Sequence, residues 1–320
     1  MAQNTLNTTA FIEAQQYSQF ILSVLPTVIL PEGFYRDVSD FGAGTTLNIK
    51  SVGTASIQEV EEDTPLIYNP IDTGNVTLTI TDYIGDAWHV TDVLRQDGAQ
   101  IDQLLAMRAQ EATRAIQQRF ESRFLAVCNA AQTAGDPNNV NGFAHRKLGS
   151  GSNDTMAEDD LIEMSLAFDK ANIPLPGRVA IVDPVVAATF EKYLTVNTNA
   201  DMSPMFKDVL MNGFNNEHKF VMNLHGWDIW TSNLLPEIAA STDVDGTNST
   251  AAASVANIFM SVVDDNHKPI MNAWRQPPKV ESERNKDRQR DEFLTTARWG
   301  VGAQRVDTLG VIVTGATATE

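Results

Sequence analysis

Three polar side chains in the last quarter of the sequence could bind a metal ion. Asp264, Asp265 and His267 place two carboxylates and one imidazole within four positions, and a metal-dependent hydrolase needs oxygen and nitrogen ligands of this kind. The same residues are typical of a polar turn between strands, and no HExxH or CxxC motif accompanies them. We favour the turn, keep the hydrolase as an alternative of a different class, and expect no catalytic residue, no bound metal and no cofactor.

The other motifs that could carry chemistry are weaker. Gly42 and Gly44 precede a strand-like segment, whereas a dinucleotide-binding loop follows a strand and opens a helix. The sequence contains neither a phosphate-binding GxxxxGKS/T motif nor a GxSxG nucleophile elbow. Cys128, the one cysteine, lies beside Val127 on an apolar helical stripe, and this position favours a buried core residue over a nucleophile.

Composition and charge restrict the class of protein further. The 320 residues include 23 Lys and Arg against 41 Asp and Glu, for a formal net charge of −18. A hydrophobic content of 42% is that of a folded protein, and the negative charge argues against a broad basic surface for nucleic acid. A single cysteine suits a reducing compartment. The longest apolar run, residues 20–30, is shorter than a membrane span and contains Pro26, so we expect a soluble protein without a membrane segment.

The charge is unevenly distributed along the chain. Residues 1–94 contain two basic residues, Arg36 and Lys50, against twelve Asp and Glu, which gives 2 − 12 = −10. Residues 275–305 contain eight Lys and Arg against five Asp and Glu, which gives 8 − 5 = +3. Solvated surface is the simpler explanation, because exposed charges usually contribute little to stability. The alternative is that the two segments meet, within one chain or between neighbouring copies.

The first 94 residues predict a short helix and then a long hairpin. Residues 10–24 are helical in pattern, and Pro26 and Pro31 prevent the helix from continuing. Residues 46–52 and 76–81 alternate apolar and polar side chains, which indicates strands with one buried face. The acidic, Pro-containing segment between them is longer than the loops of compact domains. We therefore expect this hairpin to project from the body, followed by another strand over residues 87–93.

The next segment is the strongest helical signal in the sequence. Residues 97–131 lack Pro, and their apolar side chains recur at helical spacing, so they predict one helix roughly 50 Å long at ~1.5 Å per residue. A polar linker, residues 149–154, leads to a mixed body. There Thr155 and Glu158 predict a capping box for a helix through residue 171, residues 179–182 predict a strand, and Asp183 with Pro184 predicts the start of another helix.

Four segments carry a resemblance to a known family. They are residues 45–49 (TTLNI), 171–184 (ANIPLPGRVAIVDP), 225–236 (HGWDIWTSNLLP) and 299–307 (WGVGAQRVD). In sequence and in order they resemble segments of the major capsid (coat) protein of tailed bacteriophages, which has the Hong Kong 97-type fold. The last segment departs from the family pattern, because Trp299 stands where Tyr is more usual and Val306-Asp307 where Pro-Glu is more usual.

The resemblance implies an α+β chain with the parts of the Hong Kong 97-type capsid fold. These are an N-terminal arm (residues 1–36), an extended loop formed by the acidic β-hairpin (37–94), a peripheral domain (95–154) with the spine helix 97–131, a mixed α/β axial domain (155–272) and return strands of both domains (273–320).

The resemblance also implies a structural function in the virion. Copies would form the hexamers and pentamers of an icosahedral shell that encloses double-stranded DNA without sequence-specific binding. Assembly would take place in the cytoplasm of the host bacterium with a scaffolding protein, a portal and optionally a decoration protein. An encapsulin-like cellular compartment shell, which shares the fold, is the nearest alternative.

The charge asymmetry then suggests where neighbouring copies touch. We expect acidic residues of the hairpin segment to lie against basic residues of a neighbour near the end of the chain. The acidic candidates are Glu59, Glu61, Glu62 and Asp63, and the basic candidates are Arg284, Lys286, Arg288 and Arg290.

Overall fold

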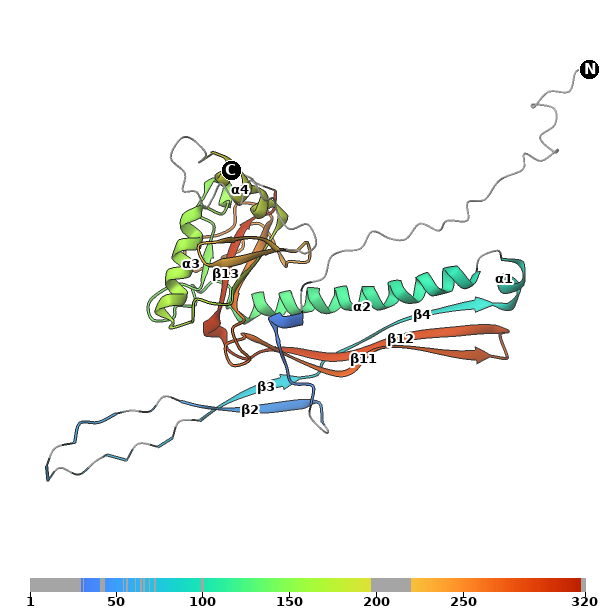
Figure 1. Cartoon of the computed structure of the whole chain (residues 1–320), viewed down its shortest axis with the longest axis horizontal. Helices are drawn as coiled ribbons and strands as arrows, with labels where there is room; N and C mark the ends of the chain where they lie inside the picture. Colours follow the sequence, from blue (N-terminus) through green and yellow to red (C-terminus); the bar gives the residue numbers. More distant parts are fainter. Residues whose placement is uncertain are drawn as a thin grey trace, which may run out of the picture.

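The computed structural model describes residues 30–317 except 31, 41–43, 54, 56, 61, 64, 66, 69, 72, 99–100 and 197–219. The helix expected over residues 10–24 and all but the end of the expected N-terminal arm lie outside this part of the chain. Two parts make up the described structure: a body built on a seven-stranded sheet and an elongated part built on a four-stranded sheet (Figure 1).

The body is centred on strand β6 (Arg178–Val182), which is buried on both faces. Such a strand needs apolar side chains at consecutive positions, and β6 supplies Val179, Ala180, Ile181 and Val182. The strand order is β5 (Arg146–Leu148), β13 (Leu309–Gly315), β10 (Ser254–Ser261), β6, β8 (Trp227–Thr231) and β7 (Phe220–Leu224), with β9 (Glu237–Ile238) paired to β10.

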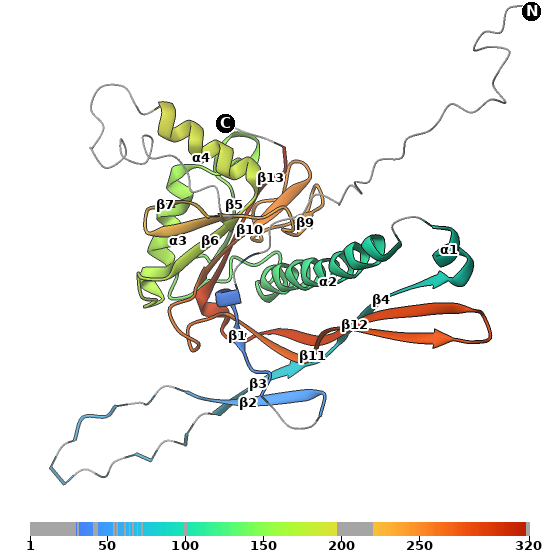
Figure 2. The ribbon, with the colours of Figure 1, turned by 45° about the vertical axis from the view of Figure 1, so that its right-hand side comes forward.

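Helices cover both faces of this sheet. Helices α3 (Glu158–Lys170) and α4 (Pro184–Val196) pack on the face that carries Ala180 and Val182. The C-terminal half of α2 (Ile101–Ala131) packs on the opposite face, where Phe124, Leu125 and Cys128 contact a cluster that includes Val179 and Ile181. Figure 2 shows α3 and α4 on one side of the body and α2 leading away from the other.

The starts of α3 and α4 test the two predicted helix caps. The prediction for α4 is confirmed, because the Asp183 carboxylate accepts the N–H of Val185 at 3.0 Å and Pro184 is the first helical residue. The prediction of a Thr155 cap is wrong: α3 begins at Glu158, and Asp160 accepts the N–H of Ala157 at 2.9 Å. The Thr155 hydroxyl lies outside the helix and donates to the Ser152 carbonyl at 3.0 Å, while the buried Asp160 carboxylate also accepts the N–H of Ser150.

The elongated part contains two long antiparallel strands, β11 (Ile270–Asn285) and β12 (Arg290–Ala303). The sheet order is β1 (Arg36–Asp37), β11, β12 and β4 (Asp82–Thr91). On one face, Trp88 of β4 stacks on Phe293 of β12 with ring centroids 4.1 Å apart, a cross-strand pair that fixes their register. Strand β4 therefore belongs to this sheet, and it begins five residues before the strand expected over residues 87–93.

The predicted 97–131 helix is interrupted near its start. Helix α1 (Asp92–Asp97) ends at Gly98, whose φ of −84° and ψ of 123° are extended, and α2 begins at Ile101. Thr91 caps α1 by accepting the N–H of Leu94. The long helix is otherwise as predicted, and Ile116 and Phe120 pack it against Ala297 and Trp299 of β12. One helix thus joins the elongated sheet to the body.

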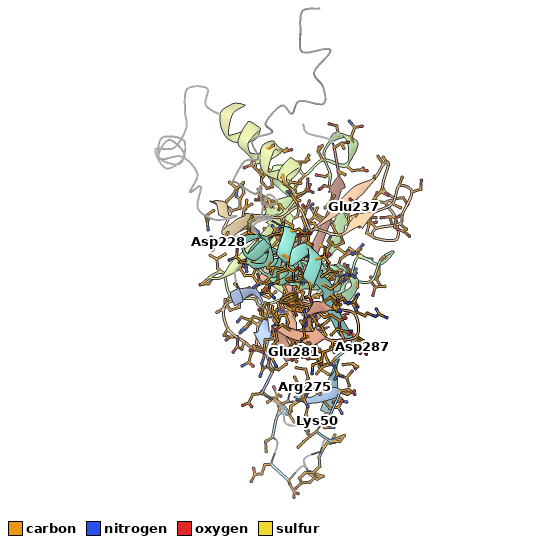
Figure 3. The ribbon with its side chains drawn as sticks, turned by 90° about the vertical axis from the view of Figure 1, so that its right-hand side faces the viewer. Lys50, Asp228, Glu237, Arg275, Glu281 and Asp287 are labelled. Atoms are coloured by element: carbon orange, nitrogen blue, oxygen red, sulfur yellow. The ribbon has the colours of Figure 1, made fainter. Side chains whose placement is uncertain are left out.

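The projecting hairpin is present as predicted, with β2 (Thr46–Val52) paired to β3 (Thr73–Thr79). Its base packs on the face of β11 and β12 that points away from α2, where Leu78 contacts Met271 and Ala273. Figure 3 looks along the long axis and shows α2, the elongated sheet and the hairpin stacked in this order. The close approach depends on Gly300 of β12, because a Cβ there would lie 2.6 Å from the Thr79 carbonyl oxygen.

We predict that Gly300→Ala destabilises this stack. The added methyl group forces the hairpin base away from β12, and overpacking of this kind typically lowers the free energy of unfolding by about 1–3 kcal/mol. Urea unfolding of the unassembled protein measures the change. Gly33→Ala is the matched control, because no atom lies within 4 Å of the Cβ it would add. Equal changes in the two variants would contradict the role assigned to Gly300.

Candidate functional site

The segment between β2 and β3, residues 53–72, exposes apolar side chains on a narrow excursion. Ile57 is 95% exposed and Tyr68 is 96% exposed. The Gln58 amide links the two sides of the excursion, because its nitrogen donates to the Ile67 carbonyl at 2.6 Å and its oxygen accepts the Ile67 N–H at 3.1 Å. The excursion therefore presents apolar side chains from two linked segments, a combination that marks interaction surfaces.

All four acidic candidates belong to this segment, and the structure describes three of them. Glu59, Glu62 and Asp63 are exposed, and no ion pair joins any of them to another residue of the described chain. Glu61 lies outside the described residues. The three carboxylates are thus available to a second molecule.

The four basic candidates lie at the turn between β11 and β12, and two of them already have partners. Arg284 binds both carboxylate oxygens of Asp92 at 2.5 Å and one oxygen of Asp291 at 3.1 Å. Arg290 binds Glu292 at 2.6 Å. The side chains of Lys286 and Arg288 make no ion pair within the part of the chain that the structure describes.

These contacts change the titration of the groups at the turn. The hydrogen bonds from Arg284 lower the pKa of Asp92, and those to Asp92 and Asp291 raise the pKa of Arg284. The hydrogen bond from Arg290 lowers the pKa of Glu292 in the same way. Arg95 adds a further pair with Asp291 at 2.6 Å. The network fastens α1 to the β11–β12 turn.

The acidic and basic candidates lie at opposite ends of the long axis of the folded molecule. The excursion extends beyond the hairpin at one end of the long axis, and the β11–β12 turn lies at the other (Figure 1). The structure therefore does not bring the two groups together within one chain.

The residues weighed as catalytic or metal-binding have structural partners instead. Asp264 accepts the N–H of His267 at 2.9 Å, and Lys268 pairs with Asp265 at 2.9 Å, so the interpretation as a polar turn is confirmed. Among the described residues no three His, Cys, Asp or Glu side chains form a metal-binding group. Cys128 is buried as predicted, and burial raises the pKa of its thiol. The hydrolase alternative has no support in this geometry.

The sequence did not identify the buried charged residues, of which Arg178 and Glu121 are two examples. Arg178 binds Asp169 at 2.6 Å and the Ile173 carbonyl at 2.7 Å, which explains why an arginine follows Gly177 in the 171–184 segment. Glu121 accepts the N–H of Leu30 at 2.9 Å and the Ser232 hydroxyl at 3.0 Å. The sequence feature that could have indicated the burial of Glu121 is its position among the apolar residues of α2.

The fold is that of phage capsid structures. The capsid protein of cyanophage P-SCSP1u superposes with a TM-score of 0.66 at 14% identity, covering 97% of this chain and 94% of that one. The mature capsid of bacteriophage PhiM1 gives a TM-score of 0.68 at 13% identity, covering 96% and 93%. The capsid of a native GTA particle gives 0.59 at 14% identity, covering 98% and 100%. The architecture is therefore the Hong Kong 97-type capsid fold.

A sequence family model narrows this class. The model described as phage capsid protein matches residues 75–314, which are 240 of the 320 residues, and the chain belongs to this family. No curated protein sequence matches the chain. The chain is a structural capsid protein that forms the shell of a virion, and nothing favours the encapsulin alternative. Within the described residues, no helix is both long and apolar enough to span a bilayer.

We predict that the Asp92–Arg284–Asp291 network weakens in acid. Because the folded pKa of Asp92 is depressed, its contribution is complete above its unfolded pKa of about 3.9 and disappears as the pH falls through the lower folded value. Hydrogen exchange of the β11–β12 turn, corrected for intrinsic rates, should therefore accelerate below about pH 4. Asp92→Asn should produce the same acceleration at pH 7.

Asp287→Asn is the control for this experiment. Asp287 lies in the same turn, and its carboxylate makes no ion pair in the described structure. Acceleration by both substitutions at pH 7 would show that general charge loss, and not the network, controls the turn.

Proposed function

We propose that copies of this chain join head to tail, with the excursion of one copy against the β11–β12 turn of the next. The proposal rests on one observation: the unpaired carboxylates of the excursion and the unpaired bases of the turn lie at opposite ends of the chain. Contacts between two different surfaces close into rings when the rotation permits. Such rings are the hexamers and pentamers of an icosahedral shell.

Ion pairs within the chain reduce the number of basic residues that are available to a neighbouring copy. Arg284 and Arg290 are held by Asp92, Asp291 and Glu292, so pairing with a neighbour requires them to share or exchange partners. Lys286 and Arg288 can pair with a neighbour without giving up an ion pair within the described part of their own chain. We assign these two residues to the contact with Glu59, Glu62 and Asp63, with Glu61 as a further candidate on the same segment.

The apolar side chains of the excursion supply the remainder of the contact. Ile67 and Ile71 are 72% and 79% exposed, and they lie on the same excursion as Ile57 and Tyr68. Burial of apolar surface contributes roughly 25 cal/mol per Å², whereas exposed ion pairs contribute little. The apolar side chains thus provide affinity, and the charges select the register of the neighbour.

This arrangement and the family membership support a fuller proposal for the domains and the assembly partners. The seven-stranded body would form the axial domain, and the elongated sheet with α2 would form the peripheral domain. The return strands would contribute to both, because β12 lies in the elongated sheet and β13 in the body. Assembly would occur in the cytoplasm of the host bacterium with a scaffolding protein, a portal and optionally a decoration protein. The net charge of −18 would allow the shell to enclose double-stranded DNA without sequence-specific binding, because phosphates are repelled. In this proposal the protein acts structurally and not as an enzyme.

Electron microscopy of the purified protein tests the function. We expect large closed shells, irregular shells or tubes, because each copy offers complementary surfaces at its two ends. Uniform small shells around cargo would favour an encapsulin-like compartment, and a discrete small oligomer would contradict a shell function.

A double-mutant cycle tests the proposed contact. Glu62→Lys and Arg288→Glu should each raise the protein concentration needed for assembly several-fold, because each places like charges opposite each other. The combined variant should recover part of the loss. Light scattering during assembly measures the threshold concentration, and additive damage in the combined variant would refute the pairing.

Two matched variants control for this cycle. Glu237→Lys changes the net charge as Glu62→Lys does, but Glu237 lies on β9 in the body, so the threshold should stay near that of the unmodified chain. Arg290→Glu removes a base that Glu292 already holds, so it should not rescue Glu62→Lys as well as Arg288→Glu does.

A further inference from the structure

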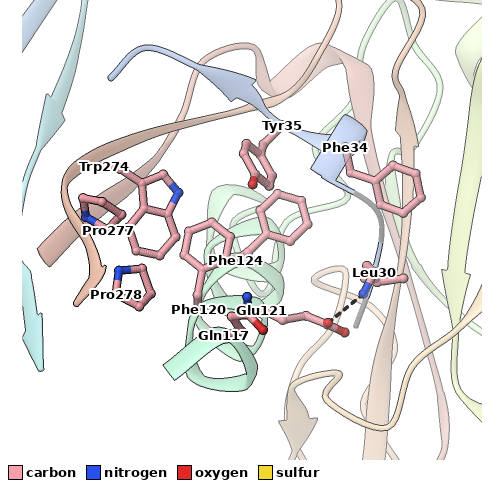
Figure 4. Close-up of a pocket in the computed structure, with 10 residues that line it drawn as sticks. All are labelled: Leu30, Phe34, Tyr35, Gln117, Phe120, Glu121, Phe124, Trp274, Pro277 and Pro278. Atoms are coloured by element: carbon pink, nitrogen blue, oxygen red, sulfur yellow. Dashed lines mark hydrogen bonds between the residues drawn. The ribbon is translucent and has the colours of Figure 1, made fainter. Parts of the chain in front are cut away.

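An apolar groove lies between α2 and β11, at the point where the described chain begins. Its volume is about 490 Å³, within the range of ligand pockets. Aromatic rings and two prolines form most of its surface, and Gln117 lies on its rim from α2 (Figure 4). The lining residues other than Gln117 are Leu30, Phe34, Tyr35, Phe120, Glu121, Phe124, Trp274, Pro277 and Pro278.

Glu121 fixes the point at which the chain enters this groove. Its carboxylate is buried and accepts the N–H of Leu30 at 2.9 Å, while its second oxygen accepts the Ser232 hydroxyl at 3.0 Å. A buried carboxylate is costly unless its oxygens are hydrogen-bonded, so the contact with Leu30 is needed by the fold itself. Leu30, the first described residue, is therefore held at the groove.

The excursion of a neighbouring copy is a poor occupant for this groove. The hairpin packs on the face of the elongated sheet opposite α2, as the stacking in Figure 3 shows. Copies in a closed shell share one inner and one outer side, so a neighbour presents its hairpin in the hairpin layer. The groove lies between α2 and β11, on the face of the sheet opposite the hairpin.

We propose that residues 20–25 of the same chain occupy this groove. This segment, FILSVL, contains five apolar residues and Ser23, which suits a groove lined by aromatic rings. Leu25 lies five residues before Leu30, and a chain of that length spans at most ~17 Å, so the tether keeps the segment near the groove. Because the two are joined covalently, docking costs little association entropy and needs no second molecule.

Disulfide trapping in the full-length chain tests the proposal. The one native cysteine, Cys128, is fully buried, so introduced thiols react without interference. In dilute, unassembled protein, Leu25→Cys with Gln117→Cys should form an intrachain disulfide at least tenfold faster than Leu25→Cys with Gln110→Cys. Gln110 is the matched control, because it is an exposed glutamine on the same helix, two turns from Gln117, and is not part of the groove.

Non-reducing gels separate the outcomes. Equal rates at the two positions, or no disulfide at either, would show that the segment does not dock and would overturn the proposal. Covalent dimers through Gln117→Cys would assign the groove to a second copy and would also overturn it. Adding Ile21→Asp to the Leu25→Cys/Gln117→Cys variant should lower the rate to that of the Gln110 pair, whereas Ser23→Asp should leave it unchanged. The readout is independent of shell assembly, so it succeeds or fails separately from the proposed head-to-tail contact.

Discussion

The shape of this protein depends on the two faces of one strand. Along β12, Ala297, Trp299 and Val301 point to α2, whereas Gly300 and Gly302 point to the hairpin. Alternation with a period of two allows the strand to bury both faces, large side chains on one and almost none on the other. The bulky face holds a helix at side-chain distance, and the glycine face lets the hairpin backbone approach directly. The face of the sheet on which the hairpin packs follows from this asymmetry.

Helix α2 transmits the same arrangement to the body. Its middle packs on Trp299, and its C-terminal half packs on the seven-stranded sheet through Phe124 and Leu125. Ion pairs from Arg108 to Asp86 at 2.7 Å and from Arg123 to Asp82 at 3.3 Å add contacts to β4. A single helix that packs on two sheets couples them mechanically, so a force applied to the elongated sheet acts on the body as well.

The parts predicted correctly from the sequence are those with strong local signals. The consecutive apolar residues of β6, the alternation in β2 and β3, and the Asp183-Pro184 start of α4 each depend on a few neighbouring residues. The predicted cap of α3 was wrong because the helix begins later, at Glu158, and the Thr155 hydroxyl donates to the Ser152 carbonyl in the preceding turn. The ion pair between Arg284 and Asp92, 192 positions apart, could not be predicted from the sequence either. The register of the sheet brings these two residues together, and their spacing in the sequence gives no sign of it.

The same limit explains what the charge pattern could and could not reveal. Counting Lys and Arg in residues 275–305 marked the β11–β12 turn, but it treated every base as available. Folding uses Arg284 and Arg290 inside the chain and leaves Lys286 and Arg288 at the turn. A contact with so few unpaired charges is weak by itself, because exposed ion pairs contribute under about 1 kcal/mol. A shell protein gains from this, since many weak contacts made together are strong while each can still be broken and re-formed during assembly.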